Sequence, residues 1–367
     1  MSEQWTAGTV VAGDRVLCPG TVSVDGDGLI ESVAPGTVDG ARQLGDVLLV
    51  PGAVDLHSDA VEKLAEPRPG VRLPFGVAVR ALDRRLAAAG VTTAYAALSL
   101  AGDEFGLRER SVTEALAHEL RALADPLVEH RLHLRVELTD EESVAAAEEL
   151  LDSGIVALLS VMNHTPGQGQ FTTTDSYVAF YSRNYAMDAR ELHARIGVKL
   201  ASAPHLEHRL ARLSAAARRA GVPFAWHDPD SARTVTRAKS HGAVIAEFPT
   251  TVDAARAAGP AGLAVAMGAP NLLLKRSTSG NLSAVDALST GSLDLLVSDY
   301  YPEALWPAAL NAGLPLPAAV ALVAGTPARA AGLADRGVLA PGRRADFVVL
   351  DRDAAVLRTV VAGRVVA

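Results

Sequence analysis

Cysteine is almost absent from this 367-residue chain, in which Cys18 is the only one. A single thiol cannot form an intramolecular disulfide, a pattern that suits a reducing compartment, so we expect a cytoplasmic protein. The hydrophobic fraction of 49% is ample for a large buried core. The length allows one large domain or two or three smaller ones.

An excess of positive charge is also lacking, because the formal net charge is −8 at pH 7. Nucleic acids and anionic membrane surfaces attract basic proteins, so we expect neither of them as a partner. An anionic small molecule remains open as a substrate if basic residues converge locally. Nothing in the composition argues against a homo-oligomer.

Long apolar runs are missing as well. The first residues, MSEQWTAGTVVAGDRV, have neither a basic start nor an apolar stretch, so we expect no signal peptide. The apolar segment from Leu314 to Leu333 is interrupted by Pro315, Pro327 and Arg329. This pattern predicts amphipathic helix and turn rather than a membrane span.

Short β-like runs occupy both ends of the chain. Residues 1–50 alternate such runs with turns, as in TVSVDGDGLIESVAP, whose two Asp-Gly pairs favour tight hairpins. Similar short β-like runs occur near the other end of the chain, in RRADFVVLDRD and VLRTVVAGRVVA. Each end alone is too short to bury a core, so we predict one small β-sandwich domain built from residues 1–50 and 337–367.

Residues 51–336 have a different sequence pattern. Apolar runs typical of buried parallel strands are mostly separated by helical segments. The helical segments include 110–125, 141–152 and 205–220. The apolar runs lie at 53–57, 91–98, 131–138, 155–161, 222–227, 243–248, 263–267 and 293–299. This alternation favours a (β/α)8 TIM-type barrel over a doubly wound sheet.

Several of the predicted strands end in side chains of the types that bind metal ions. The chemistry of such barrels lies at the carboxyl ends of their strands. His57 and Asp59 are two positions apart on one strand, so they face the same way. The other candidates at strand ends are Glu137, His164, His227 and Asp299.

Together these side chains predict a site for two divalent metal ions that share a bridging hydroxide. Their mixture of nitrogen and oxygen donors suits zinc, our first choice, and also manganese or iron. Each residue taken singly also fits a helix cap or a hydrogen-bonded core position, so the prediction rests on their common placement. We expect Asp228 to lie behind the ligands and His133 to serve in packing.

Motifs along the whole chain resemble those of a known family. They are PGAVDLHSDAVEKLAEPRPGV, RLHLRVEL, HTPGQGQF, IAEFPTT, MGAPN, SGN, SDYYPEAL and DRGVLAPGRRADFVVL. They are similar to the phosphonate-metabolism branch of the amidohydrolase superfamily, the α-D-ribose 1-methylphosphonate 5-triphosphate diphosphatases of the carbon–phosphorus lyase pathway. The resemblance implies a metal-dependent barrel with a flanking β-sandwich.

The resemblance also implies a reaction, in which water cleaves the 5-triphosphate, leaves a 5-phosphate and releases pyrophosphate. It implies that His57 and Asp59 are the first-strand ligand pair and that Asp299 takes a proton from the bridging water. The remaining matches are a bridging carboxylate, Glu137, and two later histidine ligands, His164 and His227. The superfamily usually draws its later ligands from strands four, five, six and eight, whereas these residues close strands three, four, five and eight.

A triphosphate carries about four negative charges near neutral pH, so local cations must help to bind it. The candidates for substrate binding are Lys63, Arg68, Gln168, Gln170, Asn271, Lys275 and Asn281. Arg68 is the first choice because a guanidinium can pair with phosphate through two hydrogen bonds, whereas the lysines suit solvated loops equally well.

Two other functions are open. The same metal site could hydrolyse a cyclic amide or an N-acyl amino acid, since it would polarise a carbonyl group in the same way. A binding role without catalysis is disfavoured, because clustered carboxylates repel one another unless a cation lies between them.

Overall fold

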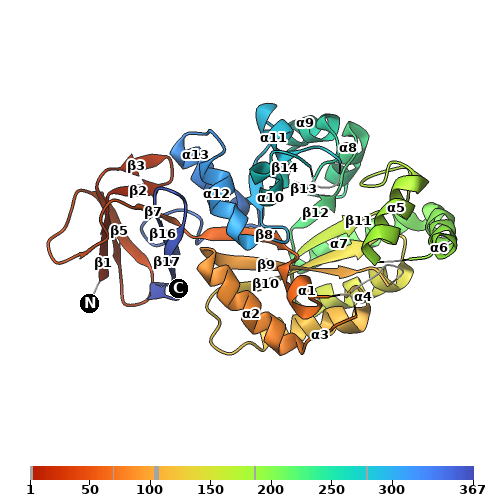
Figure 1. Cartoon of the computed structure of the whole chain (residues 1–367), viewed down its shortest axis with the longest axis horizontal. Helices are drawn as coiled ribbons and strands as arrows, with labels where there is room; N and C mark the ends of the chain where they lie inside the picture. The colour runs from red at the N-terminus through yellow and green to blue at the C-terminus, as the bar shows by residue number, and fades with distance from the viewer. Residues whose placement is uncertain (1–2, 69, 103–106, 186, 278–279) are drawn as a thin grey trace.

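The computed structural model describes residues 3–68, 70–102, 107–185, 187–277 and 280–367 (Figure 1). The predicted barrel is confirmed, because eight parallel strands form one sheet in chain order. They are β8 (Ala53–Ser58), β9 (Val91–Leu100), β10 (Glu129–Glu137), β11 (Val156–Met162), β12 (Phe224–His227), β13 (Ile245–Glu247), β14 (Ala264–Gly268) and β15 (Leu295–Val297). Each overlaps one of the predicted apolar runs. The unbroken strand order excludes the doubly wound sheet, in which the order would reverse.

The barrel closes where its first strand, β8, meets its last strand, β15. The backbone amide of Asp299 donates to the carbonyl of His57 at 3.0 Å, and the amide of Asp59 donates to the carbonyl of Asp299 at 2.6 Å. Two residues before His57 in β8, the buried Asp55 carboxylate accepts the backbone N–H of Ser298 at 2.9 Å. Burial raises the pKa of Asp55 to about 6. This seam sets the carboxylates of Asp59 and Asp299 beside each other.

Helices cover the outside of the barrel and pack on the strands through buried aliphatic side chains. The longer ones are α2 (Phe75–Ala88), α3 (Arg110–Arg121), α4 (Glu141–Asp152), α7 (Leu206–Ala220), α8 (Ala232–Ser240) and α9 (Val252–Ala261). The shorter ones are α1 (Ala60–Ala65), α10 (Ala269–Leu273), α11 (Ala284–Ser289), η2 (Pro302–Ala304), α12 (Leu305–Leu310), α13 (Leu316–Ala321) and α14 (Gly325–Ala330). Among the described residues, none of the helices has the length and apolar character that a bilayer crossing requires.

The two ends of the chain form a β-sandwich beside the barrel, as predicted, and the first and last colours of the chain mix there (Figure 1). One sheet has the order β5-β4-β1-β6 and the other the order β18-β17-β16-β7-β2-β3. Trp5 and Phe347, one from each end, meet edge to face in its core at 5.3 Å. The strands are β1 (Glu3–Ala7), β2 (Thr9–Ala12), β3 (Arg15–Leu17), β4 (Gly20–Val24), β5 (Ile30–Pro35), β6 (Arg42–Gln43), β7 (Leu48–Pro51), β16 (Phe347–Leu350), β17 (Val356–Val361) and β18 (Arg364–Val365).

The connection between β11 and β12 carries extra helices before it reaches α7. They are α5 (Thr174–Tyr185), α6 (Ala189–Ala201) and η1 (Ala203–His205), and they lie at the end of the molecule away from the β-sandwich (Figure 1). Their own core consists of buried rings and aliphatic side chains, including Phe171, Tyr177, Tyr181, Leu192 and Ile196. This excursion supplies part of the wall of the cavity described below.

Gly52 joins β7, the last sandwich strand before the barrel, to the first barrel strand. Glycine is needed at this position because no larger residue fits. A Cβ atom at this position would lie 2.3 Å from both Cγ2 and Oγ1 of Thr92, a fully buried residue of β9. The Pro-Gly pair in VPGAVD therefore marks the passage from sandwich strand to barrel strand for a steric reason.

Gly52→Ala should lower the free energy of unfolding by about 1–3 kcal/mol, the usual cost of forcing an extra methyl group into a packed core. Chemical denaturation monitored by circular dichroism measures this. Adding Thr92→Ala should restore part of the loss, since it removes the atoms that the new methyl group meets. Gly26→Ala, at a position with open space, is the control. A Gly52→Ala protein as stable as the control would contradict the close packing.

Candidate active site

A cavity of about 270 Å³ lies at the carboxyl ends of the barrel strands. This is the face on which barrel enzymes place their chemistry. The predicted ligand residues that line it are His57, Asp59, His164, His227 and Asp299. The structure therefore brings together five of the six residues that the strand-end pattern selected.

Glu137, the sixth, is fully buried behind His164 and is not among the described residues that line the cavity. Its Oε2 accepts the backbone N–H of His164 at 3.1 Å and also lies 3.1 Å from the Nδ1 of that imidazole. Its Oε1 accepts from the hydroxyl of Thr139 at 2.8 Å, and the buried Lys199 lies 3.6 Å from Oε2. Glu137 thus lies against His164 rather than at the cavity surface, and its expected role as a bridging carboxylate stays a prediction.

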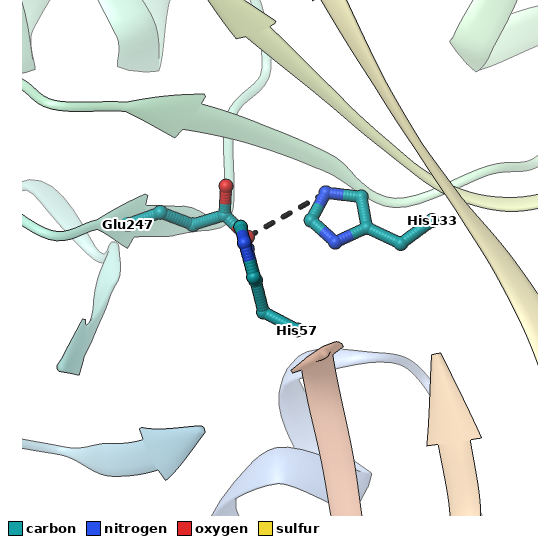
Figure 2. A group of neighbouring side chains, drawn as sticks. All are labelled: His57, His133 and Glu247. Atoms are coloured by element: carbon teal, nitrogen blue, oxygen red, sulfur yellow. Dashed lines mark hydrogen bonds and ion pairs between the residues drawn. The ribbon is translucent and has the colours of Figure 1, made fainter. Parts of the chain in front are cut away.

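Glu247, the last residue of β13, is the carboxylate at the centre of the cluster. Its Oε1 lies 3.3 Å from Nδ1 of His57, and its Oε2 lies 3.3 Å from Nδ1 of His227. Figure 2 shows the imidazoles of His57 and His133 converging on this carboxylate, with 3.6 Å between Oε1 and Nε2 of His133. Because Glu247 binds both Nδ1 atoms, the Nε2 atoms of His57 and His227 are left to face the cavity. Carboxylates orient metal-binding imidazoles in this way.

Glu247 was not among the predicted ligands, although the sequence contains its signal. It ends the apolar run 243–248 as Glu137 ends the run 131–138. It also supplies the polar residue on strand six that the superfamily pattern leads one to expect. His133 was assigned to packing, and its contacts with the carbonyl of Leu56 at 3.0 Å and the hydroxyl of Ser160 at 2.9 Å do fix it in the barrel. His133 also lies 3.6 Å from Glu247, and this third contact makes it part of the site.

The three imidazoles around Glu247 differ in how readily they carry a positive charge. Burial opposes a charge on His57, but Glu247 and Asp59 outweigh it and raise the pKa of His57 to about 10. Burial dominates at His133, whose pKa falls to about 3, and it also lowers the pKa of His227. Burial likewise opposes a charge on Glu247, yet the neighbouring imidazoles hold its pKa well below the ordinary value. Glu247 and Asp59 therefore stabilise positive charge at His57 more than at the other two imidazoles.

Asp59 and Asp299 face the same cavity with different proton affinities. Burial and the charge of Asp59 raise the pKa of Asp299 to about 7. Burial also acts on Asp59, but Arg135 and His57 overcome it and lower its pKa. Pairs of carboxylates whose pKa values are pushed apart in this way can divide charge stabilisation and proton transfer between them.

Two groups of donor residues could each hold a metal ion. In the first, ligand atoms of His57, His133 and Glu247 all lie within 4.8 Å of one another, and Nε2 of His57 also lies 3.5 Å from Oδ1 of Asp59. In the second, ligand atoms of His164, His227 and Asp228 all lie within 4.8 Å of one another. Oδ2 of Asp228 is buried without a hydrogen-bond partner in the described part of the chain, as expected of an oxygen meant for a cation. Asp228 thus stands with the donors rather than behind them, contrary to expectation.

Aromatic rings surround these donors and limit the water around them. Phe248 meets the imidazoles of His57 and His227 edge to face, with ring centres 5.0 and 5.4 Å apart. Phe180 and Tyr181, from α5, form another part of the wall. A partly apolar wall strengthens electrostatic interactions inside the cavity.

Three of the four predicted amide side chains line the cavity: Gln170, Asn271 and Asn281. Gln168 is not among the described lining residues. Its carbonyl accepts the backbone N–H of Phe171 at 3.2 Å in a tight turn. The turn presents Gln170 to the cavity and leaves Gln168 on its outer side.

The predicted cations are not where the charges of the cavity lie. Lys63, Arg68 and Lys275 are exposed and are not among the described residues that line the wall. The cations of the wall are Arg108 and Arg135, neither of which was predicted. Arg135 did have a signal, because it shares its strand face with His133 and Glu137 at two-residue spacing. Arg108 lies in the loop between β9 and α3, where no periodicity marks it.

Known proteins agree with this structure. A family model described as "Amidohydrolase family" matches residues 309–367. In fold, the chain is similar to N-acetyl-D-glucosamine-6-phosphate deacetylase from Mycobacterium smegmatis (TM-score 0.67, 20% identity, 100% of both chains). It is also similar to dihydropyrimidinase from Brevibacillus agri NCHU1002 (TM-score 0.60, 14% identity, 100% of this chain and 95% of that one).

A curated relative is closer in sequence. The alpha-D-ribose 1-methylphosphonate 5-triphosphate diphosphatase of Escherichia coli (strain K12) is 36% identical over 320 residues, which are 83% of each protein. The similarity extends over most of the chain and is not confined to a shared motif. The chain therefore belongs to the amidohydrolase family, in the branch represented by this diphosphatase.

Proposed function

We propose that this protein is a metal-dependent diphosphatase, which hydrolyses α-D-ribose 1-methylphosphonate 5-triphosphate to the 5-phosphate and releases pyrophosphate. The observation that carries the proposal is a single cavity that combines metal donors with Arg108 and Arg135, in a chain related to the diphosphatase. Two guanidinium groups suit a polyphosphate, because each can pair with phosphate oxygens through parallel hydrogen bonds.

The donor groups would hold two divalent ions, with zinc favoured by the mixture of imidazole and carboxylate. His57 and Asp59 would hold one ion, and His164, His227 and Asp228 the other. Such ions supply a nucleophile at neutral pH and neutralise the oxygens of the phosphate under attack. The single cysteine supports the cytoplasm as the place of reaction.

The chain's own residues then have distinct tasks. Asp299, whose pKa burial raises toward neutrality, accepts the proton of the attacking water. Glu247 fixes the imidazoles of His57 and His227, so that their Nε2 atoms stay aimed at the cavity. Arg108 pairs with the triphosphate, and the three amides of the wall are placed to hydrogen-bond the ribose or the phosphates.

Hydrolysis of a cyclic amide or an N-acyl amino acid is the alternative considered from the sequence. The structural relatives that act on such bonds share only the fold, at 20% identity or less. A neutral amide would offer no negative charge to Arg108 and Arg135, whereas a polyphosphate offers several. The observations therefore support the diphosphatase.

Metal analysis of the purified protein should find a divalent ion, and the loaded protein should release pyrophosphate from the ribosyl phosphonate triphosphate. Chelation should abolish this activity, and the ion should restore it. The same preparation should be tested on dihydropyrimidines and N-acyl amino acids. Cleavage of an amide without release of pyrophosphate would refute the proposal.

Asp299→Asn should keep the fold and reduce kcat by roughly 100-fold or more, the usual contribution of a general base. Asp299 has a φ of 58°, which asparagine tolerates, and it closes the barrel through its backbone rather than its side chain. Steady-state kinetics and thermal melting measure the two effects. Asp125→Asn, at an exposed residue with a φ of 48°, controls for the same substitution in the same conformation. Full activity in Asp299→Asn would remove Asp299 from this role.

Glu247→Gln should weaken metal binding by roughly 10- to 100-fold, as other losses of a carboxylate behind a metal-binding imidazole do. The glutamine side chain has an NH2 group in place of one carboxylate oxygen, so it cannot accept hydrogen bonds from both Nδ1 atoms in this arrangement, and one imidazole loses its orientation. Competition with a chromogenic chelator measures the affinity. The control is Glu207→Gln, which changes an exposed carboxylate 2.9 Å from Nε2 of His241. Equal metal affinity in the two variants would contradict the role of Glu247.

A further inference from the structure

Arg135 stands between the two groups of metal donors. One end of its guanidinium, Nη1, lies 3.2 Å from Oδ1 of Asp59, a donor of the first group. The other end, Nη2, lies 3.0 Å from Nε2 of His227, a donor of the second group. The side chain is only 5% exposed, yet it lines the cavity. A buried cation thus spans the centre of the candidate active site.

The contact with His227 cannot persist beside a bound metal ion. Nδ1 of His227 faces Glu247, so Nε2 carries the lone pair that accepts the hydrogen bond from Arg135. A metal ion would need the same lone pair. Binding of the ion and the hydrogen bond of Arg135 therefore exclude each other at this atom.

A guanidinium released in this way stays close to the ion and is repelled by it. Its Nε is already buried without a hydrogen-bond partner among the described residues, so the strand side offers it no alternative acceptor at that atom. An anion placed between two cations relieves their repulsion. A phosphate group has oxygens for both partners, and a guanidinium can pair with two of them.

We propose that Arg135 is a substrate-binding residue whose guanidinium leaves His227 and Asp59 when metal binds and then pairs with a phosphate group of the substrate. This inference rests on the proposed function, since it takes the metal ion and the polyphosphate from it. Arg135, on β10, would thus bind the phosphate for which Arg68 was the predicted partner. Arg68 is exposed and is not among the described residues that line the cavity.

The purely structural alternative is that Arg135 only neutralises Asp59. In that case its removal would disturb folding or metal binding, but the loaded protein would still bind phosphate normally. The two roles therefore differ in the affinity for an anion measured per metal-loaded site. They also differ in whether that affinity depends on metal.

The test is calorimetric titration of inorganic pyrophosphate into metal-loaded and metal-free protein, with metal content measured before and after by mass spectrometry. Arg135→Ala should weaken binding to the loaded protein at least tenfold at unchanged metal content, and Arg135→Lys should weaken it less. In metal-free protein, where Asp59 and His227 hold the guanidinium, Arg135→Ala should change the affinity less than threefold. Arg256→Ala, at an exposed residue of α9, should bind like the wild type.

Unchanged pyrophosphate affinity in loaded Arg135→Ala, or a loss explained by lost metal, would overturn the proposal. Should the alanine variant not fold, a crystal structure of the loaded wild type with pyrophosphate decides. A guanidinium within hydrogen-bond distance of a phosphate oxygen supports the proposal, and one still bound to Asp59 and His227 refutes it. Arg135-dependent binding in a protein that hydrolyses no triphosphate would refute the proposed function and leave this inference standing.

Discussion

The seam between β8 and β15 is the constraint on which the site depends. Its two backbone hydrogen bonds join residues about 240 positions apart in the chain and place Asp59 and Asp299 next to each other. The remaining strands then follow in chain order around the ring, so that every strand end faces the same opening. Without this closure, the donors from the first and last strands would belong to opposite edges of an open sheet.

Inside the barrel, the carboxylates occupy two positions relative to the cavity. Outer carboxylates hold imidazoles: Glu247 binds His57 and His227, and Glu137 binds His164. Inner carboxylates face the cavity, where Arg135 offsets Asp59 and burial leaves Asp299 with an elevated pKa. The same residue type therefore serves orientation, charge compensation or proton transfer according to what surrounds it.

Strand periodicity and strand ends were enough to predict the barrel and most of the imidazoles and carboxylates that line the cavity. All eight strands fell on predicted apolar runs, because strands that are buried on both faces consist largely of apolar residues. The β-sandwich also followed, since neither end of the chain could bury Trp5 or Phe347 alone. These features depend on local composition, which the sequence states directly.

Roles that depend on contacts across the barrel were harder to predict. Glu137 and Glu247 end their strands in the same manner, and only the partners Thr139 and Lys199 explain why Glu137 faces away from the cavity. The basic loop residues Lys63, Arg68 and Lys275 looked suitable for phosphate, but the direction of a loop cannot be inferred from its charge. Arg135 lies in the middle of its strand, and only its contacts with Asp59 and His227 on other strands reveal it as a component of the site.

The pairing of Arg135 with Asp59 has a consequence for how the protein matures. In small metal-dependent domains, the ion is needed for folding because the ligands have no other partners. Here Arg135, Glu247 and Glu137 between them already engage Asp59 and the three imidazoles, and Oδ2 of Asp228 is the exception among the described donors. These contacts hold the donors in place through protein partners alone, so the folding of this chain would not depend on metal in the way that the folding of such small domains does.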